Sequence, residues 1–303
     1  MTKIRSSDSS MVDDRRGSGG GGGGGFSFPG MGGGGGGMGF PIKAGGGVLG
    51  LLLVLAATFL PRLLNAGSTS QLGGTGSGAV PAEVADGACN SELEQIVCGA
   101  EADVQAFWAT ALPQFYGKDY TGARMELVQG SFDTGCGGAT SDVGPFYCPA
   151  DQQVYIDLVF MQQLEDKLVG TTTDLAEQYI VAHEYGHHVQ NLLGINAQVQ
   201  QASQNDPSKA NQYSVALELQ ADCYAGVWVN SVNARGLLDS TSEIAEALNA
   251  AAGVGDDRIQ QQTQGRIDKD TWTHGSAEQR QTWFNRGFTT GDPTQCTTVN
   301  EVL

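Results

Sequence analysis

The sequence predicts an α+β fold that is mostly helical and contains a small sheet. Several long stretches of the 303-residue chain place apolar residues at helical spacing. Two short apolar runs, residues 125–128 and 154–158, have the composition of strands. No internal repeat breaks this pattern, so we expect one folded domain over residues 89–303.

Five segments of that domain carry the helical pattern. They are residues 91–112, 174–193, 207–230, 241–252 and 276–284. Asp174 and Glu177 have the spacing of a capping box at the start of the second segment, and Gly194 follows its end. Asp206 and Pro207 supply an N-cap and a first-turn proline for the third.

The first part of the chain has a composition that cannot build a core. Of the 45 glycines, 19 fall at or before residue 47, so we predict a disordered Gly-rich tail over residues 1–43. The 17 apolar residues 44–60 reach the lower limit for a membrane-spanning helix. A cleaved secretory signal is the alternative, but its basic leader would be shorter. We predict an uncleaved transmembrane anchor over residues 44–64 and a flexible linker over residues 65–88.

Charge and cysteine usage differ on the two sides of this apolar segment. Residues 1–64 carry a net charge of +3 and residues 65–303 carry −20. The basic flank predicts a cytoplasmic N-terminus and an extracytoplasmic domain. The acidic domain argues against binding to nucleic acid. All six cysteines follow the segment, which suits an oxidising compartment; they allow 15 pairings, and Cys136 with Cys148 is our first choice.

The pattern that carries chemistry is a pair of histidines four residues apart. His183 and His187 lie on one face of a predicted helix, where two imidazoles can bind one zinc ion. Glu184 follows His183 and is the candidate general base toward a metal-activated water. The pattern alone could also arise by chance on a solvated helix face.

A second helix offers the remaining ligand. A catalytic zinc site needs three protein ligands and one open position, and Glu218 can be the third ligand. Asp222, one turn further, can accept the second ring N–H of a liganding histidine, which we expect to be His183. The sequence therefore predicts one catalytic Zn²⁺.

Other residues have two interpretations each. His274 is the candidate oxyanion donor, or else a surface or capping residue before the helix at residue 276. His188 is expected to be structural, and Gly186 to let the second helix approach closely. The strand 154–158 could pair with an extended peptide, or be an ordinary structural strand. Residues 256–258 could bind calcium or a substrate terminus, although a helix N-cap with a local ion pair is the interpretation that we favour.

These motifs together resemble the bacterial neutral zinc metallopeptidase family. The resembling segments are residues 134–137, 144–149, 154–157, 183–190, 218–223, 255–258 and 273–276. The resemblance covers roughly residues 89–300. It implies a zincin fold with His183, His187 and Glu218 as zinc ligands and Glu184 as the base.

The sequence thus predicts a membrane-anchored zinc endopeptidase that acts on a peptide or protein substrate outside the cytoplasm. One alternative is a non-catalytic, zinc-stabilised envelope binding protein, in which His274 or another residue fills the fourth ligand position. Another alternative keeps hydrolysis but replaces the peptide with a cell-wall amide.

Overall fold

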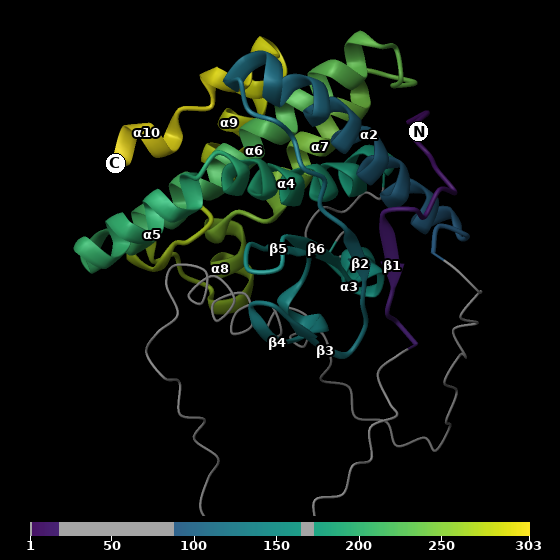
Figure 1. Cartoon of the computed structure of the whole chain (residues 1–303). Coiled ribbons are helices and arrows are strands. Elements are labelled where there is room, and N and C mark those ends of the chain that lie inside the picture. The colour runs from purple at the N-terminus through teal and green to yellow at the C-terminus, as the bar shows by residue number, and fades with distance from the viewer. Residues whose placement is uncertain (1, 18–87, 165–172) are drawn as a thin grey trace, which may run out of the picture.

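Helices make up most of the chain that the computed structural model describes, which is residues 2–17, 88–164 and 173–303 (Figure 1). The helices are α2 (Glu92–Tyr116), α3 (Leu158–Leu164), α4 (Asp174–Leu192), α5 (Ile195–Asn205), α6 (Ala210–Ala234), α7 (Ser242–Gly253), α8 (Asp256–Gln264), α9 (Ala277–Thr290) and α10 (Thr298–Val302). Together with two small sheets they form a mostly helical α+β domain, as the sequence predicted.

The larger sheet has four strands in the order β1-β2-β6-β5. Its strands are β1 (Val12–Asp14), β2 (Met125–Leu127), β5 (Phe146–Cys148) and β6 (Gln153–Ile156). β1, β2 and β6 run parallel, and β5 pairs with β6 in the antiparallel direction. A separate hairpin joins β3 (Ser131–Thr134) to β4 (Gly137–Thr140).

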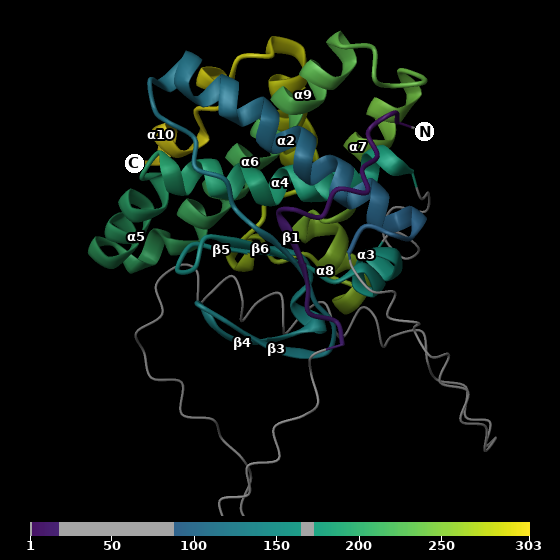
Figure 2. The ribbon, with the colours of Figure 1, turned by 45° about the vertical axis from the view of Figure 1, so that its right-hand side comes forward.

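Helix α4 lies between the larger sheet and helices α2 and α9, whereas α3 and α8 lie on the same side of it as the sheet (Figure 2). It packs against α2, α6 and α7, and α9 packs against α6 and α7. The α6–α9 crossing is very close, since a Cβ added at Gly287 would lie 1.9 Å from the carbonyl oxygen of Cys223. Only glycine permits this approach, which fixes α9 and the loop before it relative to α6.

The predicted helices form, with changes at their ends. Ser91 and Glu94 make a reciprocal capping box before α2, which continues to Tyr116. The N-cap of α4 is Thr173 rather than Asp174, and it makes no side-chain capping bond. Asp174 is instead bound to a guanidinium: Arg5 donates to its carboxylate over 2.9 Å. The capping box proposed for α4 is therefore wrong.

Two expectations about strands are also corrected. The predicted tail 1–43 is not disordered over residues 2–17, because this segment forms β1 and pairs with β2. The strand at residues 154–158 ends at Ile156 and lies between β2 and β5. Both of its edges are already paired, so it cannot pair with a peptide substrate. The free edge on that side of the sheet belongs to β5.

The predicted membrane anchor, residues 44–64, lies outside the described residues, as do residues 18–43 and 65–87. Within residues 2–17, 88–164 and 173–303, no helix is both long enough and apolar enough to cross a bilayer.

The six cysteines form three disulfides. They are Cys89–Cys98, Cys136–Cys148 and Cys223–Cys296. The predicted Cys136–Cys148 pair is confirmed; it joins the β3–β4 hairpin to β5. The last bond closes the longest loop and fixes the C-terminal segment to α6.

Candidate metal centre

Two packed helices bring the predicted metal ligands together. α4 carries His183, Glu184 and His187, and α6 carries Glu218. The helices approach closely at Gly186, where an added Cβ would lie 3.1 Å from both the Cα and the carbonyl oxygen of Ala221. Gly186 therefore allows the close approach that the sequence suggested.

The three candidate ligand residues lie close enough to share one zinc ion. The Nε2 atom of His183 lies 3.2 Å from one carboxylate oxygen of Glu218, and Nε2 of His187 lies 3.4 Å from the other. Ligand atoms about 2.0–2.1 Å from a tetrahedral ion lie roughly 3.3–3.4 Å apart. All three candidate ligand atoms fall within 4.8 Å of one another. The two imidazoles and the carboxylate are ligands that suit Zn²⁺, and a single ion lies within reach of all three.

A buried carboxylate orients the first histidine. Asp222 is fully buried and lies 2.9 Å from Nδ1 of His183, so that Nε2 faces the metal position. This is the contact that the sequence predicted. Tyr179 donates its hydroxyl to the same carboxylate over 2.5 Å. Arg280, from α9, donates over 2.7 Å and 2.8 Å to its two oxygens.

The second histidine is held from its own helix. Nδ1 of His187 lies 2.8 Å from the side-chain oxygen of Gln190, one turn further along α4. The amide nitrogen of Gln190 then donates to the main-chain oxygen of Leu217 over 2.7 Å. Leu217 precedes Glu218, so one side chain connects the orientation of His187 to the position of the third ligand.

The charges of the site favour a cation. Burial alone would lower the pKa of His183, but Asp222 and Glu218 together raise it to about 10. Burial would raise the pKa of Glu218, but the charge of His187 and hydrogen bonding to His183 hold it well below its usual range. Carboxylates that stabilise a positively charged imidazole would also stabilise a divalent cation. Protons and the metal ion would compete for the same histidine nitrogens.

Glu184 has the environment of a general base. It is buried beside the two histidines, and this burial raises the pKa of its carboxyl, although the charges of His183 and His187 oppose the rise. A raised carboxyl pKa brings proton transfer closer to neutral pH.

His274 lies on the loop before α9, where one carboxylate organises the backbone. A single oxygen of Asp256 accepts the main-chain N–H groups of Thr273, His274 and Gly275 over 2.7, 2.7 and 2.9 Å. The other oxygen lies 3.2 Å from Nδ1 of His274. Gly275 has φ +89°, a conformation that favours glycine. A positive charge on His274 would help to lower the pKa of Glu218, although less than His187 and His183 do.

Asp256 therefore does more than start α8. Its side chain fixes the loop that carries His274, whereas Asp257 accepts the main-chain N–H of Ala277 over 2.7 Å. The expected N-cap with a local ion pair is wrong, because the N-cap of α8 is Gly255, without a side-chain capping bond, and the ion-pair partner of Asp256 is the distant His274.

His188 faces away from the metal position, as the sequence suggested. Its Nδ1 lies 3.1 Å from the hydroxyl of Tyr147, and its Nε2 lies 2.6 Å from the main-chain oxygen of Thr121. These contacts join α4 to the loop before β2 and to β5. His188 is therefore structural.

The sequence did not single out Arg280, Tyr179, Gln190 or the role of Asp256. Tyr179 and Gln190 share the α4 face of the two histidines, at four residues before His183 and three after His187, so their spacing could have indicated them. Arg280 lies 58 residues after Asp222, and Asp256 lies 18 residues before His274. No spacing rule predicts these two contacts.

Comparison with known proteins gives the family. The family model described as "Putative neutral zinc metallopeptidase" matches residues 1–299. The uncharacterised protein YpfJ of Escherichia coli strain K12 is 51% identical over 188 residues, which are 62% of this chain and 65% of that relative. The uncharacterised protein Rv2575 of Mycobacterium tuberculosis strain H37Rv is 50% identical over 206 residues, 65% of this chain and 67% of the relative. No solved structure matches.

The match covers nearly the whole chain, and the His183–His187–Glu218 cluster is the ligand set that the family resemblance implies. The chain therefore belongs to this family of neutral zinc metallopeptidases.

Proposed function

We propose that the chain is a zinc-dependent endopeptidase whose metal is held by His183, His187 and Glu218. The observation that carries the proposal is that His183, His187 and Glu218 each bring one ligand atom within 4.8 Å of the other two, beside the buried carboxyl of Glu184. Zinc bound there would activate a water molecule and polarise the scissile carbonyl.

The protein's own residues would then move protons and stabilise charge. Glu184 would accept a proton from the attacking water and pass it to the leaving amine. His274, held through Nδ1 by Asp256, would direct Nε2 toward the oxyanion of the tetrahedral intermediate. Asp222 would keep His183 in the tautomer that presents Nε2 to the metal.

Metal stoichiometry tests the ligand set directly. Wild type should bind one zinc ion per chain, and His187→Ala and Glu218→Ala should each lose it. Full zinc occupancy in Glu218→Ala would remove the third ligand from the proposal. His274→Ala serves as the matched histidine control and should retain zinc. Loss of zinc in that control would instead favour the closed, four-ligand site of a non-catalytic binding protein.

Substrate class needs a separate assay, because the metal site alone does not distinguish peptide bonds from other amides. Unstructured protein and isolated cell-wall material should be incubated with the same enzyme preparation. Cleavage of the protein and not of the cell wall supports the peptidase proposal. Cleavage of the cell wall alone would replace it with the amide hydrolase alternative.

We also propose that the domain works outside the cytoplasm and is attached to a membrane through residues 44–64. Three disulfides that use all six cysteines support an oxidising compartment. The apolar composition of residues 44–60 supports attachment.

A further inference from the structure

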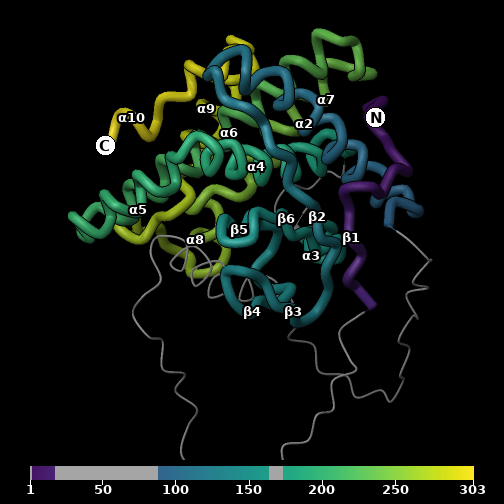
Figure 3. The backbone as a smooth tube through the Cα atoms, in the orientation of Figure 1, coloured from purple at the N-terminus to yellow at the C-terminus, as the bar shows by residue number. Residues whose placement is uncertain are grey.

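Residues 2–17, here called the N-terminal arm, lie along the domain over their whole length (Figure 3). In β1 the register pairs Val12 with Met125 of β2. The main-chain N–H of Met125 donates to the carbonyl of Met11 over 2.9 Å. Nearer the start of the arm, the main-chain N–H of Lys3 donates to Leu237 over 2.9 Å. The arm thus extends the sheet at one end and reaches the loop before α7 at the other.

The arm contributes to the core and contacts the helix that carries the metal ligands. Ile4 and Val12 are 6% and 5% exposed. Gln178, on α4 five residues before His183, accepts from the hydroxyl of Thr2 over 2.9 Å and donates to the carbonyl of Ile4 over 2.7 Å. Gln178 is itself fully buried, so without the arm its amide would lose both of these hydrogen bonds.

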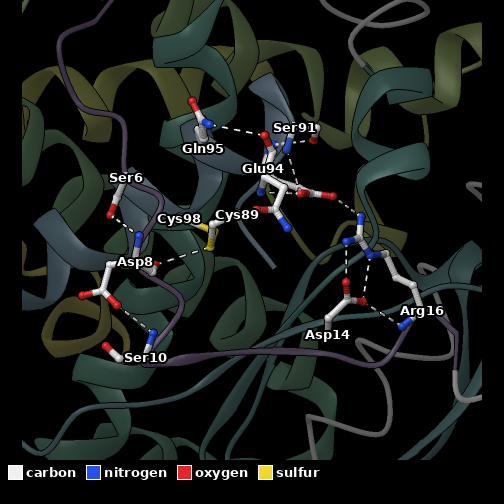
Figure 4. The surroundings of a disulfide bond; sticks show 11 residues. Ser6, Asp8, Ser10, Asp14, Arg16, Cys89, Ser91, Glu94, Gln95 and Cys98 are labelled. Atoms are coloured by element: carbon white, nitrogen blue, oxygen red, sulfur yellow. Dashed lines mark hydrogen bonds and ion pairs between the residues drawn. A yellow bond between two sulfur atoms is a disulfide. The ribbon is translucent and has the colours of Figure 1, made fainter. Parts of the chain in front are cut away.

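Charged side chains bind the arm to both α2 and α4, and Figure 4 shows the contact of Arg16 with Glu94 of α2. Arg16 donates to Glu94 over 2.6 Å, while Arg5 donates to Asp174 over 2.9 Å. Glu94 is the carboxylate that also completes the capping box at the start of α2. Near the Cys89–Cys98 disulfide, the sulfur of Cys89 lies 3.4 Å from the carbonyl oxygen of Asp8.

One glycine of α2 is needed for this contact. A Cβ added at Gly99 would lie 2.7 Å from the Cα of Arg5 and 2.8 Å from the carbonyl oxygen of Ile4. Both are backbone atoms, which cannot rotate away. The arm is therefore fitted to the surface of α2 at this position.

We infer that the N-terminal arm is an integral part of the metal domain and lies on the same side of the membrane as His183, His187 and Glu218. A strand cannot pair with β2 across a bilayer. Any membrane crossings between residues 17 and 88 must then be even in number, which includes none. The apolar stretch 44–60 has 17 residues, which is enough for one crossing only. The docked arm therefore opposes a single transmembrane crossing by residues 44–64 and the predicted orientation, with a cytoplasmic N-terminus and an extracytoplasmic domain. The membrane attachment proposed above would then have to hold without a crossing.

Thiol labelling of the full chain in intact cells tests the inference. All six native cysteines are in disulfides, so an introduced cysteine is the only free thiol. Ser7→Cys reports the exposed part of the arm, and Gln204→Cys on α5 reports the domain. We expect a membrane-impermeant maleimide to label both to the same extent.

The possible results separate this inference from the proposed location. Labelling of Gln204→Cys in intact cells, with Ser7→Cys labelled only after permeabilisation, would overturn the inference. If both sites required permeabilisation, arm and domain would still share one side, and only the extracytoplasmic location would be wrong.

Gly99→Ala in the purified full chain gives a second test, in which the sign of the effect decides. Alanine is favoured over glycine inside a helix, so without a docked arm the substitution should raise the Tm. With the arm docked, the clash should lower the Tm and speed tryptic cleavage at Arg15 and Arg16. A higher Tm with an unchanged cleavage rate would show that the arm does not pack on α2.

Discussion

Asp222→Asn is the substitution that tests the support of the metal site most sharply. The carboxylate is fully buried and accepts two hydrogen bonds from Arg280, one from Tyr179 and one at Nδ1 of His183. An amide has the same shape but only one oxygen, so its NH₂ group must face a donor on one side. Arg280, which is also buried, would keep only the more distant carboxylate of Glu218, at 3.9 Å, as a counter-charge.

The expected cost follows from that burial. Breaking a buried ion pair by removing one partner costs about 3–5 kcal/mol. For a domain of this size each 1 kcal/mol shifts the Tm by about 2–4 °C, so the Tm should fall by roughly 6–20 °C. Zinc affinity should fall about 10- to 100-fold, because the tautomer of His183 is no longer fixed.

Asp103→Asn is the matched control. Asp103 makes a bidentate pair with Arg235, with both distances 2.7 Å, but 43% of the Arg235 side chain is exposed. Asp103 also accepts a hydrogen bond from the indole of Trp228, which the oxygen of an asparagine can still accept. Exposed pairs contribute about 1 kcal/mol or less. Thermal unfolding with and without a chelator, together with competition titration of zinc, measures both variants. Equal Tm shifts in the two variants, with zinc affinity unchanged in Asp222→Asn, would refute the reasoning.

Three further predictions concern other parts of the domain. Asp256→Asn should lower kcat/KM about 10- to 100-fold while zinc is fully retained. In a double variant with His274→Ala it should lower kcat/KM little further, because both substitutions act through the same imidazole, and additive losses would contradict this. Gly186→Ala should lower the Tm and weaken zinc binding, since its Cβ would lie 3.1 Å from backbone atoms of Ala221 and separate the ligand-bearing helices; a higher Tm with zinc affinity unchanged would show that the helices tolerate the group. Burial raises the pKa of Glu101 to about 7, so the stability of the fold should fall as the pH rises from about 4.5 to 7 and the buried carboxyl loses its proton. Glu101→Gln should therefore raise the Tm at pH 8 but hardly at pH 5. An equal rise in Tm at both pH values would exclude this cause.

The metal site was predictable because its parts follow helical periodicity. His183 and His187 share a helix face at four residues, as do Glu218 and Asp222. Once the two helices pack side by side, these spacings largely determine where the four side chains lie. In the structure His183, His187 and Glu218 do lie together. Asp256 and Arg280 could not be found in the same way, since tertiary contacts alone bring them to His274 and Asp222.

The arm was missed because composition hid it. Residues 2–17 precede a long run of glycines, and their few apolar residues do not form a strand pattern of their own. β1 is stabilised by pairing with β2, and the arginines Arg16 and Arg5 of the arm pair with carboxylates of α2 and α4. The interpretation of residues 154–158 as a peptide-binding edge failed for a related reason. Strand order depends on long-range pairing with β2 and β5, which local sequence does not report.

The central claim is that Glu184 acts as the base of a zinc-dependent hydrolysis. Glu184→Gln preserves shape and burial but removes the proton acceptor. The account predicts one bound zinc per chain, as in wild type, and peptide hydrolysis reduced about 10²- to 10⁴-fold. Zinc retained at full occupancy together with an unchanged rate of peptide hydrolysis would contradict the account.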